Sequence, residues 1–203
     1  VVFFTFFNVL LIKLSYFLLK YDNLFYFELS KKLSFSQIKK IIELQNKQEW
    51  ISYIIIPIFL LIKSTLISSF LYIGTFFYSK TKVTFKQLFN AVVKAEFVFL
   101  GVGVLKIVWF YFFQTNYTLE DLQYFYPLSA LNIVGYKGLE SWLIYPLQTL
   151  NLIEFGYIIY LSYQIGFLTK TNADNGFKIM MYSYVPTLLL WVCVVMFLTL
   201  SMS

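Results

Sequence analysis

The sequence predicts an all-α membrane protein with five transmembrane helices, an interfacial amphipathic helix and a short re-entrant or interfacial helix. Three observations favour this fold class. Of the 203 residues, 60% are hydrophobic and 13% are charged, whereas soluble domains average about 45 to 50% apolar and 25% charged residues. The mean hydropathy is +0.72. The apolar residues also gather into runs long enough to cross a bilayer, so we expect an integral membrane protein.

Five apolar runs reach the length that a transmembrane helix needs. At a rise of 1.5 Å per residue, about 20 residues cross roughly 30 Å of hydrocarbon. Pro57 and Pro186 are tolerable in such helices when neighbouring groups satisfy the freed carbonyl. We expect residues 1–50 to hold the first helix and the amphipathic segment, and residues 51–203 to form a four-helix membrane domain. The predicted spans are residues 1–19, 51–78, 91–113, 142–168 and 179–200.

The most polar stretch of the chain, residues 21–49, separates the first two spans. Within it, four apolar residues recur at helical spacing opposite three lysines, which is typical of an amphipathic helix that lies on a membrane surface. A solvated linker helix is the alternative. The apolar positions are Phe35, Ile38, Ile41 and Ile42, and the lysines are Lys39, Lys40 and Lys47.

The loop after the third span begins with a helix-start signal. Thr118 can cap a helix, and Glu120 and Asp121 then lie near its positive end. Pro127 ends that helix, and the apolar residues 128–134 are too few to cross a bilayer. We therefore predict a short helix at residue 118, followed by a re-entrant or interfacial segment.

The residue types present exclude much site chemistry. The chain has no histidine, and all sixteen of its basic residues are lysine. Without imidazole we expect no histidine-ligated metal or haem and no Ser-His or Cys-His nucleophile. The single cysteine, Cys193, lies in an apolar run, and we interpret it as a packing or lipid-facing residue. We expect no cofactor, no metal and no enzymatic activity.

Ionisable groups at membrane depth are costly and mark candidate functional positions. Lys13 and Lys106 lie close enough to a span end for their ammonium groups to reach the head groups. Lys63 and Glu154 lie near the middle of their spans, so we expect them to pair and join two helices. An ion or proton path and a contact with another subunit are the alternatives. The polar candidates inside the membrane are Lys63, Glu96, Lys106, Glu154, Tyr157 and Gln164.

Two of the predicted spans carry a face that we expect to turn towards protein. In the fourth span a semi-polar stripe recurs at spacings of three and four residues and consists of Glu154, Tyr157, Leu161 and Gln164. In the second span the corresponding face contains small side chains that permit close helix contact, at Ser64, Ser68, Tyr72 and Thr75.

The distribution of lysine predicts an orientation. Residues 21–49 contain five lysines and four acids, whereas the shorter loop 79–90 carries Lys80, Lys82 and Lys86 and no acid. The loop after the fourth span lies on the same side as loop 79–90 and adds Lys170 and Lys178. By the positive-inside rule we expect these short loops and the amino end inside, and the carboxyl end outside.

Several short motifs occur over residues 51–200. They are Lys82-Val-Thr84-Phe85-Lys86-Gln87-Leu88, Pro127-Leu-Ser, Trp142, the turn from Lys170 to Lys178, and Tyr182-Ser-Tyr-Val-Pro186. These motifs resemble those of the Yip1-domain family in its bacterial form, whose basic turn has the form Lys-x-Ser/Thr-Phe-Lys-Gln-Leu. This chain departs from the family in having Tyr78-Ser79 where a glycine pair often opens the turn. The resemblance implies a five-helix fold and no reaction.

Function is expected to follow from membrane association. The first hypothesis is a non-enzymatic accessory or scaffold subunit of a larger membrane protein complex, in a bacterial inner membrane. The second is a transport or permease-like subunit with Glu154 and Lys63 in a polar path. The expected partners are the lipid bilayer and other membrane protein subunits, and not nucleic acid.

Overall fold

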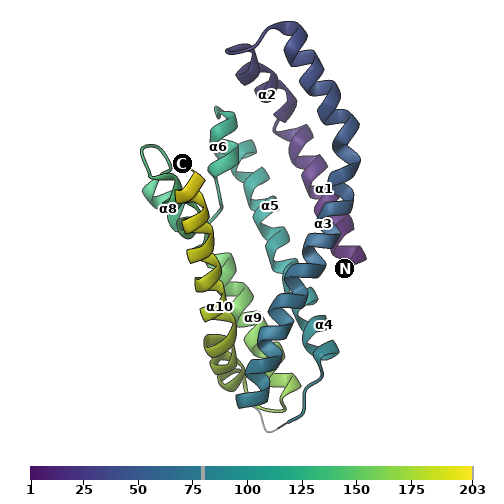
Figure 1. Ribbon diagram of the computed structural model, residues 1–203, viewed down its shortest axis with the longest axis vertical. Coiled ribbons are helices and arrows are strands. Elements are labelled where there is room, and N and C mark those ends of the chain that lie inside the picture. The colour runs from purple at the N-terminus through teal and green to yellow at the C-terminus, as the bar shows by residue number, and fades with distance from the viewer. Residues whose placement is uncertain (79–80, 203) are drawn as a thin grey trace. The chain divides into compact units, whose positions relative to one another are not determined.

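A computed structural model describes residues 1–78 and 81–202, and this part of the chain contains helices and no β-strand. The predicted all-α class is confirmed. Two residues used in the predictions lie outside the described residues: Ser79, which differs from the family's turn, and Lys80, one of the lysines that predict the orientation. Figure 1 shows the elements, which in chain order are α1 (Val2–Leu18), α2 (Tyr21–Ser30), α3 (Phe35–Tyr78), α4 (Phe85–Ala95), the 3-10 turn η1 (Glu96–Phe99), α5 (Leu100–Val108), the π-helical turn η2 (Trp109–Phe113), α6 (Leu119–Tyr124), α7 (Ala130–Val134), α8 (Ser141–Thr149), α9 (Leu152–Leu168) and α10 (Ala173–Met202).

Two helices of the described chain are long and apolar enough to cross a bilayer. They are Trp50–Tyr78, which is the later part of α3, and α10. A third candidate arises if α1 and α2, which are bent by 59° at the break between them, count as one span. The predicted second and fifth spans thus correspond to continuous helices.

The predicted third and fourth spans are helical but interrupted. Residues 91–113 pass through the end of α4, η1, α5 and η2. The expectation of one helix over residues 142–168 is wrong, because α8 ends at Thr149 and α9 starts at Leu152. Asn151 causes the break: its side chain accepts from the Glu154 N–H at 2.7 Å and donates to the carbonyl oxygens of Gln148 and Thr149. One asparagine therefore satisfies the ends of both helices.

The expected amphipathic helix is not a separate element. α2 ends at Ser30, and the Ser34 N–H donates to Gln37 Oε1 at 3.0 Å where α3 begins. No glycine or proline lies between Phe35 and Trp50, so α3 continues unbroken into the apolar part (Figure 1). The position of this segment relative to a membrane surface stays a prediction. Of its four apolar residues, one is buried, one is exposed and two are half-buried, namely Ile38, Phe35, and Ile41 with Ile42.

The described chain divides into two compact units. The first comprises residues 1–61 and 103–125, and its small core contains Leu19, Phe110 and Leu122. The predicted helix start at Thr118 is confirmed, since its side chain accepts from the Asp121 N–H and caps α6. The predicted division into residues 1–50 and 51–203 stays a prediction.

The second unit comprises residues 62–102 and 126–203 and holds the larger core. α10 packs along α9 in an antiparallel pair, and α4 packs against α9 (Figure 1). The fully buried side chains at these contacts include Val92, Leu161, Ile165 and Met180. Gly176 of α10 lies so close to the Ser162 carbonyl oxygen of α9 that no Cβ fits between them.

Local hydrogen bonds and a glycine define the ends of two helices in the second unit. Thr84 and Gln87 form a capping box at the start of α4, which gives a physical reason for the Thr-Phe-Lys-Gln sequence. The short helix α7 ends at Val134, is followed by Gly135 with a φ of 84°, and is too short to cross a bilayer, as predicted. Residues 128–130 pair with residues 150–152 through two backbone hydrogen bonds, Ala130 N–H to Leu150 and Leu152 N–H to Leu128.

Replacing Gly176 with alanine tests the contact between α9 and α10. The added Cβ would overlap the Ser162 carbonyl, so we expect Gly176→Ala to lower the free energy of unfolding by about 1 to 3 kcal/mol in detergent micelles. Gly101→Ala is the matched control, because a Cβ there meets nothing within 4 Å and should stabilise the helix by about 0.5 to 1 kcal/mol. Equal unfolding midpoints for the two variants would contradict the close contact.

Candidate functional site

A lysine and a glutamate form an ion pair inside the second unit. Lys63 Nζ of α3 lies 2.8 Å from Glu96 Oε2, and the two side chains are 34% and 3% exposed. We expected Lys63 to pair with Glu154, and this expectation is wrong, because the carboxylate that receives the ammonium belongs to the third predicted span. The pair therefore joins α3 to η1 rather than to α9.

The local backbone explains why Glu96 lies at this point. α4 gives way to η1 at Glu96, and the 3-10 turn places Phe99 one turn further on the same face. Lys63 Nζ lies 4.3 Å from the centre of the Phe99 ring, so the ammonium contacts the ring face as well as the carboxylate. A short change of helix type thus supplies both partners of Lys63.

Tyr157 closes the site from α9. Its side chain is fully buried, and its hydroxyl donates a long hydrogen bond of 3.4 Å to Glu96 Oε1. Its ring lies 5.0 Å from the Phe99 ring. Glu96 therefore has the ammonium on one carboxylate oxygen and a phenol on the other, as a buried carboxylate requires.

A second polar contact joins α9 to α10. The Tyr184 hydroxyl donates to Glu154 Oε1 at 2.6 Å, and the Tyr184 ring lies 5.6 Å from the Tyr157 ring. Because Glu154 is in the first turn of α9, its carboxylate also lies near the positive end of that helix. The two tyrosine rings bring the Glu154 contact next to the Lys63–Glu96 pair.

Two further phenols approach this cluster from the loop side. Burial, together with the negative charge of Glu154, raises the pKa of Tyr126 to about 12, so Tyr126 is a neutral hydroxyl at physiological pH. The Trp191 indole N–H of α10 donates to the Tyr145 hydroxyl of α8 at 3.0 Å. Hydroxyl groups thus line the cluster towards residues 126–145.

The other residues predicted from the sequence lie on α9, on α3 and in the first unit. The stripe of α9 faces protein as expected, with Tyr157 and Leu161 fully buried and Gln164 half-buried. The face of α3 is confirmed at Ser64, Ser68 and Thr75, which are buried, whereas Tyr72 is 44% exposed. Lys106 belongs to the first unit and donates to the Leu122 carbonyl oxygen at α6.

The sequence assigned no role to Phe99 or Tyr184 of the cluster, nor to Asn151 at the start of α9. Nothing singles out the side chains of Phe99 and Tyr184 in a chain with 24 phenylalanines and 17 tyrosines. Asn151 does carry a signal, because Asn-Leu-Ile-Glu has a capping residue followed three positions later by glutamate. Among residues 1–78 and 81–202, no three His, Cys, Asp or Glu side chains gather as metal ligands. The cluster therefore joins helices through one ion pair and two tyrosine–glutamate hydrogen bonds.

Replacing Lys63 alone should lower the free energy of unfolding more than replacing Lys63 and Glu96 together. Lys63→Met leaves the Glu96 carboxylate buried without its counter-charge, and we expect a loss of about 3 kcal/mol in the free energy of unfolding. The double variant Lys63→Met, Glu96→Gln should recover most of this loss, because no uncompensated charge remains. Denaturant unfolding in micelles measures both. Additive losses in the double variant would mean that the two side chains do not interact.

The Tyr184 hydroxyl is testable by a single-atom deletion. Tyr184→Phe removes the donor to Glu154 and keeps the ring, so we expect a loss of about 1 to 3 kcal/mol in unfolding free energy. Tyr182→Phe is the matched control on the same helix, since Tyr182 is 64% exposed and stacks on Tyr78 through its ring. A loss in Tyr182→Phe as large as in Tyr184→Phe would count against the Glu154 contact.

Comparisons of the chain with protein-family models, with curated protein sequences and with solved structures find no match.

Proposed function

We propose that this chain is an integral membrane protein of five spans, similar to bacterial Yip1-domain proteins, which acts as a non-enzymatic accessory or scaffold subunit of a larger complex in the bacterial inner membrane. The observation that carries the proposal is the closed polar cluster of the second unit. Lys63, Glu96 and Tyr157 satisfy one another, and Tyr184 satisfies Glu154, so these groups brace four helical segments against each other.

The exposed surfaces of the long helices support membrane residence. Large apolar side chains stay exposed at spacings of three and four residues, which is the stripe that a lipid-facing helix presents. Stripes of this size are rare on soluble monomers. They comprise Ile55, Phe59, Ile62 and Leu66 of α3, Leu152, Phe155 and Ile159 of α9, and Leu190, Val194 and Phe197 of α10.

Five crossings require the two interrupted segments to span as well. Residues 85–113 are helical without a gap through α4, η1, α5 and η2, and at about 1.5 Å per residue this exceeds the hydrocarbon thickness. α9 has 17 residues, the short end of the range for a tilted span. Breaks in such helices are tolerated where the freed backbone groups find partners inside the protein, as at Asn151.

One loop contact supports the part of the proposed topology that puts the two lysine-bearing loops on one side. The Thr81 hydroxyl donates to the Thr169 carbonyl oxygen at 2.8 Å, so the loop after α3 and the loop after α9 lie at the same end of the second unit. Both loops carry lysine, and the positive-inside rule puts such short loops on the cytoplasmic side. Residues 31–47 and Lys137 then belong to the opposite side.

A transport function is the second candidate, and one observation favours it. Glu154 accepts from Tyr184 and forms no ion pair among the described residues, so it is the carboxylate of the cluster that lacks a counter-charge in contact. Such a group inside a membrane is a default candidate for an ion or proton path. Flux through reconstituted vesicles that is abolished by Glu154→Gln would favour transport over scaffolding.

Cysteine labelling tests the five spans and their orientation. In a Cys193→Ser background, Lys86→Cys and Asn175→Cys should react with an impermeant maleimide only from the cytoplasmic side. Lys40→Cys and Lys137→Cys should react only from the other side; all four residues are exposed. The Cys193→Ser parent without added cysteine is the control. Labelling of Lys86→Cys and Asn175→Cys from opposite sides would contradict the proposed topology.

Co-purification tests the scaffold role. Extraction of the full chain in a mild detergent should bring down other membrane proteins in fixed stoichiometry. Variants that place charge on the exposed apolar side of the amphipathic segment, such as Phe35→Asp, should lose them while the chain stays folded. A homogeneous chain without co-purifying protein, together with Glu154-dependent flux, would replace the scaffold by the transport function.

A further inference from the structure

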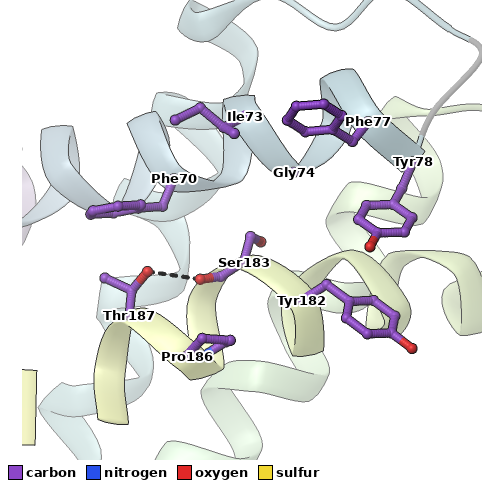
Figure 2. Close-up of a pocket in the computed structure, with 9 residues that line it drawn as sticks. All are labelled: Phe70, Ile73, Gly74, Phe77, Tyr78, Tyr182, Ser183, Pro186 and Thr187. Carbon is purple, nitrogen blue, oxygen red and sulfur yellow. Dashed lines mark hydrogen bonds between the residues drawn. The ribbon is translucent and has the colours of Figure 1, made fainter. Parts of the chain in front are cut away.

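A groove between α3 and α10 opens at the surface of the second unit. It has a volume of about 620 Å³, and Figure 2 shows its two walls. Gly74 brings the helices together, since a Cβ on it would lie 2.8 Å from Ser183 Cβ. The lining residues are Phe70, Ile73, Gly74, Phe77 and Tyr78 of α3 and Tyr182, Ser183, Pro186 and Thr187 of α10.

The polarity of the groove changes along its length. Phe70 lies at one end, opposite Thr187 (Figure 2). The Thr187 hydroxyl donates to the Ser183 carbonyl oxygen at 2.8 Å. Tyr78 and Tyr182 lie at the other end, with stacked rings 5.1 Å apart. Tyrosine is typical of the level at which hydrocarbon meets head groups. The hydroxyls of Ser183 and Thr187 are both bonded to carbonyl oxygens within α10, so the groove runs from an end without a free hydroxyl to an end that carries two tyrosines.

Basic residues lie in the chain segments that adjoin the tyrosine end of the groove. Lys178 precedes Tyr182 by one turn of α10, so the two residues share a face of that helix. The Thr81–Thr169 hydrogen bond holds the loops that carry the other lysines at this end. Among residues 81–90 and 169–178 there are four exposed lysines and one acid, Asp174, a net of +3; the lysines are Lys82, Lys86, Lys170 and Lys178.

We propose that this groove binds one anionic phospholipid, with an acyl chain between α3 and α10 and the phosphate among the lysines of the two loops. The order apolar, aromatic and cationic along the groove matches the order of acyl chain, glycerol and phosphate along the lipid. A partner helix would leave the cationic end without a counter-charge. The inference rests on the proposed membrane residence and adds a ligand to it; the cytoplasmic leaflet, where the lysine loops are expected, carries anionic lipid.

Native mass spectrometry of the full chain from mild detergent tests the site. With equal amounts of dioleoylphosphatidylglycerol and dioleoylphosphatidylcholine, we expect one tightly retained lipid and a clear preference for the anionic one. Lys82→Gln with Lys178→Gln should reduce this preference by about fivefold for each lysine lost. Lys137→Gln, an exposed lysine outside these two loops, is the control and should change nothing. Equal binding of the two lipids, or equal effects of all three lysines, would overturn the proposal.

A second pair of variants tests the acyl-chain part without touching charge. Thr187→Phe fills the groove and should reduce retention of the anionic lipid at least tenfold. Thr199→Phe is matched, because Thr199 lies on the same helix and its hydroxyl donates to its own i−4 carbonyl, as that of Thr187 does. Unchanged retention in Thr187→Phe, or full competition by glycerol 3-phosphate, would overturn the proposal. Neither result affects cysteine labelling or co-purification, so the proposed function is judged separately.

Discussion

A buried carboxylate in an apolar bundle is the constraint on which the second unit depends. Glu96 is almost fully enclosed, and neither lipid nor an aliphatic core can solvate it. It is tolerated because Lys63 supplies the counter-charge and Tyr157 a hydroxyl, each from a different helix. Movement of α3 away from η1 would leave a charge without its partner, and movement of α9 would remove the hydroxyl from the second carboxylate oxygen, so these contacts fix how the three segments meet.

The packing around this pair is consistent with assembly by close contact rather than by hydrophobic burial alone. Helices in lipid gain little from exchanging lipid for protein, so small residues that allow near approach carry much of the association. In this unit Gly74 meets Ser183, and Gly176 meets the backbone of Ser162. The polar cluster then specifies which faces come together, while the apolar stripes of α3, α9 and α10 stay exposed.

The sequence predicted features that depend on composition and on neighbouring residues. The all-α class, the continuous helices over residues 51–78 and 179–200, the cap at Thr118 and the buried stripe through Tyr157 and Leu161 follow from hydropathy and helical periodicity. Lys63 was rightly expected to form an ion pair, but Glu154 was the wrong partner, because hydropathy shows that both Glu96 and Glu154 lie within apolar runs and does not show which helices meet. The break at Asn151 does not show in the length of the apolar run, which continues through it, and only the spacing of Asn151 and Glu154 signals the start of a new helix.

A distance measurement between Lys63 and Glu96 in a lipid bilayer tests this account most directly. With ¹⁵N at the Lys63 side chain and ¹³C at the Glu96 carboxyl, solid-state NMR reports their dipolar coupling. A contact of 2.8 Å between Nζ and Oε2 predicts strong coupling, which should be lost in a Glu96→Gln variant and kept in Glu154→Gln. Absence of coupling to Glu96, or coupling of Lys63 to Glu154 instead, would contradict the arrangement of the helices described above.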